Sequence, residues 1–315
     1  MAAKLAIVVP CYNEEEVLPI TIGELNRLLK DLMEKQLITP DSSVYYVDDG
    51  CKDKTWEIIE QHHRENPLVK GIKLAGNVGH QNALLAGLMH VKESYDVSIS
   101  IDADLQDDTA VIEDMVRFYL QGKDIVYGVR SDRSTDTFFK RTTAQGFYKV
   151  MKLFGIKSVY NHADFRLMSK RALEALSQYK ERNLFLRGIV SNMGFQTECV
   201  YYSRKERMAG ESKYPFKKMV KFAFDGITSF SIKPMDFIMG TGILMLLFTI
   251  VMAIYSLIRH ANGAVVPGWT SLWLSIWFVG GIMTFSIGLV GEYMGKIYME
   301  VKERPRFIID QVLEK

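Results

Sequence analysis

The stretch Val97-Ser-Ile-Ser-Ile-Asp-Ala-Asp-Leu-Gln-Asp-Asp108 contains an apolar, β-branched run that leads directly into a cluster of carboxylates. A helical pattern follows over Ala110–Leu120, where apolar residues recur at helical spacing. A strand that passes through an acidic turn into a helix is one unit of an α/β fold, and ligands in such folds bind at the carboxyl ends of the strands. The polar residues of this stretch are therefore placed where a binding site is expected.

The same alternation runs through the whole N-terminal part of the chain. Short apolar runs predict strands at Leu5–Val9, Val44–Val47, Val69–Leu74, Val97–Ile101 and Asp124–Val129. Longer amphipathic stretches predict helices at Glu15–Glu34, Thr55–Arg64, Gln81–Val91 and Ala110–Leu120. This pattern favours βαβ units, so we expect an α/β domain with a mostly parallel sheet.

The middle of the chain, residues 131–215, is less regular and is rich in Arg and Lys. It predicts helices near Phe138–Phe154 and Lys170–Tyr179, and a short β element near Gln196–Tyr202. The rest of this region is expected to form loops.

Bulk composition resembles that of a soluble protein, with 48% hydrophobic residues and a net charge of +2 over 315 residues. A balance this close to neutral gives no reason to expect nucleic acid as a partner. Cys11, Cys51 and Cys199 lie far apart and form no CxxC pattern, which argues against a zinc site or a disulfide framework. The run Leu5–Val9 is shorter than the apolar region of a signal peptide, so the N-terminal domain is expected in a reducing, cytosolic setting.

Two long stretches near the C-terminus, Phe237–Ile258 and Ala261–Gly291, contain no charged residue. A membrane span needs about 20 apolar residues, and a buried helix of a soluble protein is rarely so long and so apolar on all sides. We therefore predict two transmembrane helices at about residues 235–258 and 269–291. Gly291 and Gly295 form a small-xxx-small step, which is compatible with helix packing in a homo-oligomer but is weak support for one.

The basic residues around these spans predict their orientation. The loop Arg259–Gly268 has one formal positive charge, whereas the outer flanks carry Lys213, Lys217, Lys218, Lys221 and Lys233 before the first span, and Lys296, Lys302, Arg304 and Arg306 after the second. The positive-inside rule then places both termini and the catalytic domain on the cytoplasmic side of the inner (plasma) membrane. Lys213–Phe224 mixes lysines with aromatic residues and predicts a helix that lies on the membrane surface, with a soluble surface helix as the alternative.

These observations divide the chain into four parts. We expect residues 1–212 to form a cytoplasmic N-terminal domain and residues 213–233 to form the interfacial helix. Residues 234–300 form the two-helix membrane domain, and residues 301–315 form a cytoplasmic C-terminal tail.

The acidic strand end at Asp102 and Asp104 predicts a metal site. Alternate residues of a strand share one face, so the two carboxylates can converge, with Gln106 close behind if the chain turns. Oxygen ligands of this kind suit Mg²⁺ or Mn²⁺, which would bridge the protein to the phosphates of a nucleotide. The alternative is a strand end capped by helix-starting aspartates, a role that we expect for Asp107 and Asp108.

Two further clusters, Val8–Glu15 and Val44–Thr55, also join a strand to a helix through residues with acceptor oxygens. A carboxylate there can accept a hydrogen bond from a uracil N–H or a ribose hydroxyl, although a βα turn capped by Asp or Asn is an equally good reading of either cluster alone. The sequence contains neither GxGxxG nor GxxxxGK[ST], so it predicts neither a dinucleotide fold nor a P-loop.

Five motifs in order resemble glycosyltransferase family 2, and more narrowly the polyprenyl-phosphate glycosyltransferases, which include dolichol-phosphate mannose synthases and bactoprenol glucosyltransferases. They are Pro10-Cys-Tyr-Asn-Glu14, Asp48-Asp-Gly-Cys-Lys-Asp-Lys-Thr55, Gly76-Asn-Val-Gly-His-Gln-Asn-Ala83, Asp102-Ala-Asp-Leu-Gln-Asp107 and Arg207-Met-Ala-Gly-Glu-Ser-Lys-Tyr214. The chain departs from the family pattern at Cys51, where Ser is usual, and at Asp108-Thr109.

The resemblance implies a GT-A fold and a role for each matching residue. The base and ribose of the donor would be held by Pro10, Tyr12, Glu14 and Asp48. Asp102 would reach both the ribose and the metal, and Asp104 and Gln106 would complete the metal site. Phosphates would be handled by Arg130 and Arg141, and the donor would be closed in by Arg207, Ser212 and Lys213.

The implied reaction moves a sugar from a nucleoside diphosphate to a polyprenyl phosphate with inversion, to give a lipid-linked monosaccharide for cell-envelope glycans. The attacking phosphate oxygen is already ionised, so no strong general base is required, and a cation and arginines serve the leaving diphosphate. UDP-glucose and undecaprenyl phosphate are the first expectations; UDP-GlcNAc, UDP-galactose, GDP-mannose and a dolichyl lipid remain open. Two alternatives are a polysaccharide synthase, whose Gln-x-x-Arg-Trp motif is missing from the sequence, and a non-catalytic membrane scaffold.

Overall fold

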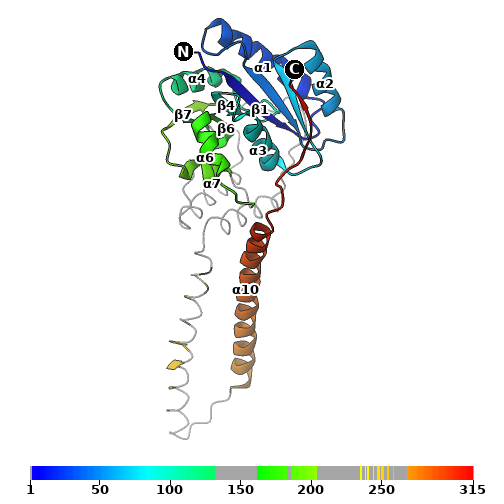
Figure 1. Cartoon of the computed structure of the whole chain (residues 1–315). Coiled ribbons are helices and arrows are strands. Elements are labelled where there is room, and N and C mark those ends of the chain that lie inside the picture. The colour runs from blue at the N-terminus through cyan, green and yellow to red at the C-terminus, as the bar shows by residue number, and fades with distance from the viewer. Residues whose placement is uncertain are drawn as a thin grey trace.

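The computed structural model describes residues 2–131, 162–182, 186–203 and 268–314, together with scattered positions between 235 and 258. An α/β domain carries both ends of the chain, and the long helix α10 (Trp269–Val301) extends away from it (Figure 1). The predicted helix at Phe138–Phe154 and the interfacial helix at residues 213–233 lie outside the described residues.

The described part of the domain is built on one eight-stranded sheet, with the order β7-β5-β6-β4-β1-β2-β3-β8. Its strands are β1 (Leu5–Cys11), β2 (Ser43–Asp48), β3 (Val69–Leu74), β4 (Val97–Ser100), β5 (Ile125–Arg130), β6 (His162–Ser169), β7 (Thr197–Tyr202) and β8 (Ile309–Leu313). β1 to β4 run parallel, as does β7 beside β5, whereas β6 and β8 are antiparallel to their neighbours. The prediction of a mostly parallel α/β sheet is confirmed.

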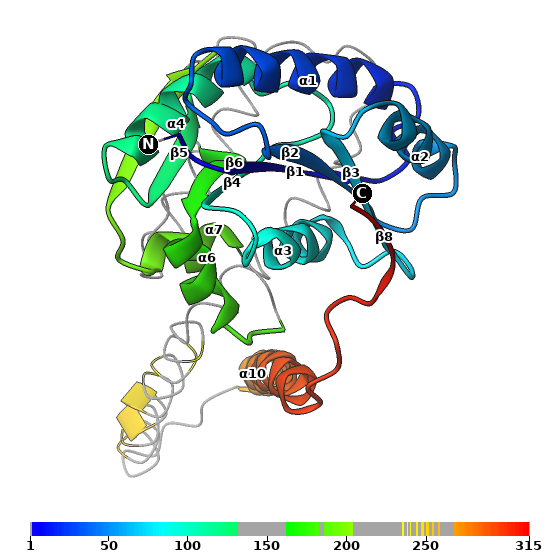
Figure 2. The ribbon, with the colours of Figure 1, turned by 45° about the horizontal axis from the view of Figure 1, so that its top comes forward.

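Helices cover both faces of this sheet (Figure 2). One face packs against α1 (Leu18–Glu34), α2 (Thr55–Glu65) and α4 (Ile112–Leu120), the last preceded by the short 3₁₀ helix η1 (Thr109–Val111). The other face packs against α3 (His80–Val91), α6 (Lys170–Ser177) and α7 (Leu186–Asn192). The sheet is thereby enclosed in a three-layer sandwich.

The central strand β1 shows why this sandwich forms. All seven of its residues are buried, and alternate side chains enter opposite cores, with Ile7 in the layer of α1 and Val8 in the layer of α3. Gly87 of α3 lies directly against the sheet, because a Cβ atom there would come within 2.8 Å of Val47 Cγ2 and closer still to Val8. This close approach brings α3 down onto the strands whose ends form the candidate site.

Strand β6 was not predicted, and it changes the layout of the sheet. It inserts between β4 and β5 and runs antiparallel to both. Its sequence is His-Ala-Asp-Phe-Arg-Leu-Met-Ser, in which the charged residues Asp164 and Arg166 are buried. Because these charged residues interrupt the apolar pattern, the segment is not recognised as a strand from its sequence. The long-range pairing of β6 with β4 places these two charged residues beside the acidic turn that follows β4.

Helix α10 has 33 residues, which corresponds to about 50 Å at 1.5 Å per residue, against about 30 Å for the hydrocarbon core. Phe278–Val301 is long and apolar enough to cross a membrane, and almost none of its apolar part is buried; it is the one such helix among the described residues. The described positions of the first predicted span are helical, with exposed side chains such as Leu244, Phe248 and Ile254. A two-span arrangement stays a prediction.

The end of the chain forms an unexpected strand. Within the segment predicted as a tail, Ile309–Leu313 forms β8, which pairs antiparallel with β3 at one edge of the sheet. The backbone N–H of Ala75 also donates to the carbonyl of Ile308 (2.9 Å). The chain therefore returns from α10 to the catalytic domain and extends its sheet (Figure 2).

Candidate active site

Three of the predicted donor-binding residues lie at the carboxyl ends of neighbouring strands. Pro10 is buried in β1 opposite Val47, and Asp48 is the last residue of β2. Tyr12 follows β1 with 39% of its surface exposed. Parallel pairing of β1 with β2 and β4 brings these positions to the same edge of the sheet as the acidic turn after β4.

Asp48 has the geometry of a binding carboxylate. Its Oδ1 accepts a hydrogen bond from the Cys51 N–H (3.1 Å), which holds the side chain in place. Its Oδ2 is buried and has no hydrogen-bond partner among the described residues. A buried carboxylate oxygen without a donor is unfavourable, so a ligand N–H or O–H at this position would satisfy it.

Hydrogen bonds join the loop after β1 to the loop after β2. The thiol of Cys51 accepts from the Asn13 N–H (3.2 Å), and Thr55 Oγ1 accepts from the Glu14 N–H (2.9 Å). Asn13 Oδ1 accepts in turn from the Lys52 N–H (2.9 Å). Asn13 has a φ of 54°, a left-handed conformation that Asn tolerates better than most residues. These bonds shape the turn that carries Glu14, which is partly buried.

Asp49 has a different role from its neighbour Asp48, because it is turned into the domain. Its carboxylate accepts from the backbone N–H groups of Val78 (2.7 Å) and Gly79 (3.0 Å) and from Asn77 Nδ2 (3.1 Å). Burial raises the pKa of Asp49, and the two backbone donors oppose that rise. Asp49 thereby positions the turn that begins α3, including His80.

The predicted metal residues form a tight turn after β4. Asp104 Oδ1 accepts from the Gln106 N–H (3.2 Å), and Leu105 between them has a φ of 50°. Gln106 is buried, whereas Asp102 and Asp104 are partly exposed. The pKa of Asp102 is raised to about 6 in total: loss of water on its protein-facing side is the largest cause, the carboxylates of Asp107, Asp164 and Asp104 add to the rise, and His80 opposes it. A cation at this turn would relieve the accumulated negative charge.

These residues fit a divalent metal that is shared with a nucleotide. No group of three His, Cys, Asp or Glu side chains among the described residues forms a ready-made metal site. Mg²⁺ is usually held by only one or two protein carboxylates together with substrate phosphates. The hard oxygen donors of Asp102, Asp104 and Gln106 are the appropriate chemical type, and the remaining ligands would come from the substrate.

A second charged cluster, which the sequence did not reveal, lies beside Asp102. His80 Nε2, at the start of α3, is 3.5 Å from Asp102 Oδ1 and 3.7 Å from Asp164 Oδ2. Asp164 also pairs with Arg166 Nη2 (2.5 Å) and with the Nε and Nη2 atoms of Arg187 (3.2 and 3.1 Å). His80 belongs to a motif quoted above, but Asp164 and Arg187 reach the site only through the pairing of β6 and the position of α7.

In this second cluster one carboxylate, Asp164, pairs with two guanidinium groups. Burial raises the pKa of Asp164, but Arg187 and Arg166 outweigh it and hold that pKa well below its ordinary value. Arg166 is fully enclosed, whereas 32% of the Arg187 side chain is exposed. Two guanidinium groups thus lie near the predicted metal residues, and guanidinium groups are chemically suited to phosphate oxygens.

The expectation that Asp107 caps the following helix is wrong. Asp107 is 2% exposed and accepts hydrogen bonds from Arg130 Nη2 (3.1 Å) and from the Tyr202 hydroxyl (2.5 Å). Asp108 does cap η1, accepting from the Ala110 N–H (3.3 Å). Since Asp107 precedes that cap, its side chain is directed inward to β5 and β7. Arg130 therefore has a buried partner, and its predicted role at a phosphate stays a prediction.

Four predicted site residues, Arg141, Arg207, Ser212 and Lys213, lie outside the described residues. Their roles rest on the resemblance alone. Seven predicted site residues lie together at the carboxyl ends of the strands: Pro10, Tyr12, Glu14, Asp48, Asp102, Asp104 and Gln106. Arg130 is hydrogen-bonded to Asp107, which follows Gln106 in the acidic turn.

Residues 6–177 match the family described as Glycosyl transferase family 2. An uncharacterized glycosyltransferase, YkoT of Bacillus subtilis, is 55% identical over 97% of this chain and 91% of its own length. The bactoprenol glucosyl transferase of Shigella phage SfV is 40% identical over 99% of this chain and 100% of its own. A solved glucosyl-3-phosphoglycerate synthase from Mycobacterium tuberculosis, in complex with Mn²⁺, UDP and phosphoglyceric acid, is 15% identical with a TM-score of 0.43, covering 72% of this chain and 76% of its own.

Proposed function

Because the chain belongs to glycosyl transferase family 2, we propose that it transfers a sugar from a nucleoside-diphosphate sugar to a polyprenyl phosphate in the membrane. The observation that carries this proposal is that one chain combines a cluster of carboxylates at the strand ends with a long apolar helix. Unsatisfied and crowded carboxylates, Asp48 and Asp102, gather at one sheet edge, and a helix long enough to cross a membrane is attached to the same domain.

The acceptor is argued from the length of the resemblance. Relatives named bactoprenol glucosyl transferase align over 97–99% of this chain, so the likeness includes α10 and β8 as well as the catalytic domain. A polyprenyl phosphate keeps its tail in the bilayer and its phosphate at the surface, where a membrane-anchored enzyme can meet it. The proposed acceptor is undecaprenyl phosphate in the inner membrane. We propose that the protein is anchored there by two spans, with both of its termini on the cytoplasmic side.

The described residues divide the work of donor binding. Asp48 Oδ2 would accept from the base or ribose, and Pro10, Tyr12 and Glu14 would line the same position. Asp102, Asp104 and Gln106 would hold Mg²⁺ or Mn²⁺, which neutralises charge on the leaving diphosphate when bound. Arg187, oriented by Asp164, would add positive charge near His80, which lies 3.5 Å from Asp102.

The chemistry needs no strong base on the protein. The phosphate oxygen of the acceptor is ionised near neutral pH and attacks the anomeric carbon as the bond to the diphosphate breaks. The main task of the chain is to hold the two substrates in line and to stabilise the leaving group. A single displacement inverts the anomeric centre, and we propose glucose from UDP-glucose as the transferred sugar.

The test uses the full-length protein in detergent with undecaprenyl phosphate, Mg²⁺ or Mn²⁺ and a panel of UDP- and GDP-sugars. Glycolipid is detected by mass spectrometry, and nucleotide release is measured in parallel. We expect glycolipid from one donor, and its loss with EDTA or in Asp104→Asn. The matched control is Asp108→Asn, which changes a neighbouring carboxylate that caps η1 and to which no metal-binding role is assigned. Equal loss in both variants, or nucleotide release from every donor without glycolipid, would contradict the proposal.

A further inference from the structure

The segment that follows the membrane helix returns to the catalytic domain over a short distance. Helix α10 ends at Val301, and Glu303, two residues later, adopts a left-handed φ of 46°. Strand β8 begins at Ile309. We call residues 300–314 the strut. It contains the last two residues of α10, the connecting segment and β8, and it contacts the catalytic domain at both ends.

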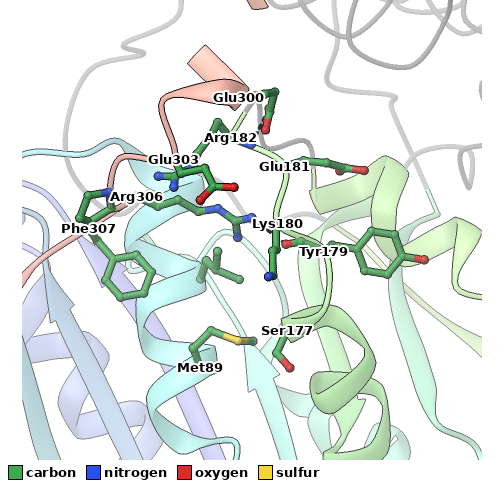
Figure 3. A pocket seen from close by; sticks show the side chains of 12 residues that line it. Met89, Ser177, Tyr179, Lys180, Glu181, Arg182, Glu300, Glu303, Arg306 and Phe307 are labelled. Atoms are coloured by element: carbon green, nitrogen blue, oxygen red, sulfur yellow. Dashed lines mark hydrogen bonds between the residues drawn. The ribbon is translucent and has the colours of Figure 1, made fainter. Parts of the chain in front are cut away.

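At the membrane end, the strut bonds to the loop that follows α6. Glu300 Oε1 accepts from the Arg182 N–H (2.6 Å), and Arg306 Nη2 donates to the Tyr179 carbonyl (2.6 Å). These groups border a cavity of about 750 Å³ that is also lined by Met89 of α3. In Figure 3 the Arg306 side chain extends from the strut toward the loop that carries Tyr179 and Lys180. Arg306 is half-buried in this junction, and its pKa is lowered by that burial and by the nearby Arg182.

At the other end, β8 is joined to the sheet and to the end of α3. Glu314 Oε1 accepts from the Tyr45 hydroxyl (3.1 Å) and lies 2.6 Å from His90 Nε2. Leu313 packs so closely on Gly71 of β3 that a Cβ atom there would lie 3.1 Å from Leu313 Cδ1. Phe307 and Ile309 pack against the core on the α3 side of the sheet. Ladder bonds, side-chain bonds and apolar contacts therefore all hold this strand in place.

Helix α3 connects these contacts with the candidate site. The strut reaches α3 at its C-terminal end, through His90 and the cavity side chain Met89. The first residue of the same helix, His80, lies 3.5 Å from Asp102. A helix of 12 residues is about 18 Å long and stiff, so fixing one end constrains the other.

We infer that the strut is a positioning element for the reaction, which sets the height and tilt of the active site above the bilayer. The inference rests on the proposed function, because it requires an acceptor whose phosphate is confined to the membrane surface. Reaction rates depend steeply on how the reacting groups are placed, and a displacement of about 1 Å can cost about 100-fold. A rigid connection to a membrane helix supplies that placement, whereas donor binding does not depend on it.

The experiment inserts a twelve-residue Gly-Ser linker between Glu303 and Arg304 of the full-length protein. Such a linker spans about 19 Å on average and leaves β8 and Arg306 free to dock as before. The matched control carries the same linker between Pro40 and Asp41, an exposed turn at the opposite end of β2 from Asp48. Both are assayed in lipid nanodiscs with undecaprenyl phosphate, and in solution with a short-chain, water-soluble polyprenyl phosphate.

We expect the strut variant to lose about tenfold or more in kcat/KM for the membrane-bound acceptor. Its KM for the donor, its melting temperature and its activity on the soluble acceptor stay near those of the wild type. A milder variant, Arg306→Gln, is expected to lower the ratio of membrane-bound to soluble activity in the same direction, without the risk that the insertion carries for folding.

Equal activity of the strut variant and the wild type on both acceptors would overturn the inference. So would a parallel loss on both acceptors, or a fall in melting temperature that accounts for the loss, since either result would show that the strut only stabilises the fold. If the wild type forms no glycolipid from either acceptor, the proposed function fails first, and the inference fails with it.

Discussion

Asp107 and Arg130 form a buried pair that decides how the acidic turn is held, and neutralising Asp107 tests this directly. The carboxylate is 2% exposed, and the guanidinium side chain is 25% exposed. Asp107→Asn keeps the shape and an acceptor for the Tyr202 hydroxyl, which lies 2.5 Å away, but it removes the charge that compensates Arg130. The expected loss is therefore specific to charge.

The magnitude follows from the burial of the pair. Removing one partner of a buried ion pair costs about 3–5 kcal/mol, because the remaining charge is left uncompensated. The partial exposure of Arg130 lets water screen part of this, so we expect Asp107→Asn to lose about 2–3 kcal/mol. For a domain of this size, that corresponds to a fall of about 4–12 °C in melting temperature.

The assay is thermal unfolding of the full-length protein in detergent, for Asp107→Asn, Arg130→Met and the double variant. We expect the double variant to be more stable than the sum of the two single losses by at least about 1 kcal/mol, since it leaves no buried charge unpaired. Asp108→Asn serves as the control and should change stability by less than about 1 kcal/mol.

The reasoning would be refuted if Asp107→Asn unfolded within about 1 °C of the wild type, which is below about 0.5 kcal/mol. A variant Arg130→Met that kept full stability but lost sugar transfer would return Arg130 to the phosphate role implied by the resemblance. Losses that simply add in the double variant would show that the two side chains do not act as a pair.

Three further predictions follow from the described contacts. Asp49→Asn removes a charged acceptor of the Val78 and Gly79 N–H groups, so we expect a loss of about 1–3 kcal/mol in thermal unfolding and weaker donor binding by calorimetry. Gly87→Ala forces a methyl group against Val47 and should lower the free energy of unfolding by about 1–3 kcal/mol. Its comparison variant is Gly122→Ala, where no atom lies near the added Cβ and only the positive φ opposes the substitution. Arg187→Gln should raise the KM for the nucleotide-sugar about tenfold, or about 1.4 kcal/mol, in a steady-state assay. Arg171→Gln, which removes an exposed arginine paired with Asp124, should leave that KM unchanged.

Local patterns were sufficient for the elements that repeat along the first part of the chain. Apolar runs and helical spacing predicted β1 to β5 and the helices between them, because each βα unit is encoded by residues that are neighbours in sequence. The acidic ends of β1, β2 and β4 could likewise be expected at one edge, since parallel strands end together. The motifs then indicated a nucleotide-sugar and a metal, chemistry that depends on residue type and spacing.

Long-range pairing determined the rest. Nothing near Asp48 and Asp49 distinguishes them, yet Asp49 bonds to a turn about thirty residues away while Asp48 retains an unsatisfied oxygen. Asp164 and Arg187 enter the site only because β6 inserts between β4 and β5, and Asp107 meets Arg130 only because β5 and β7 lie behind it.

The strand β8 is the clearest case of this division. Ile309-Asp-Gln-Val-Leu313 has neither the alternation nor the continuous apolar run by which a strand is recognised from its own sequence. Its pairing with β3 depends on an open sheet edge more than two hundred residues earlier in the chain and on the Gly71 surface that receives Leu313. Sequence pattern thus indicated which chemistry the chain is suited to. Tertiary contacts decided which carboxylates remain available for ligands and how the long helix α10 is joined to the α/β domain. The physical reason is that propensity and spacing act between near neighbours, while burial and hydrogen-bond satisfaction depend on partners that only the completed fold supplies.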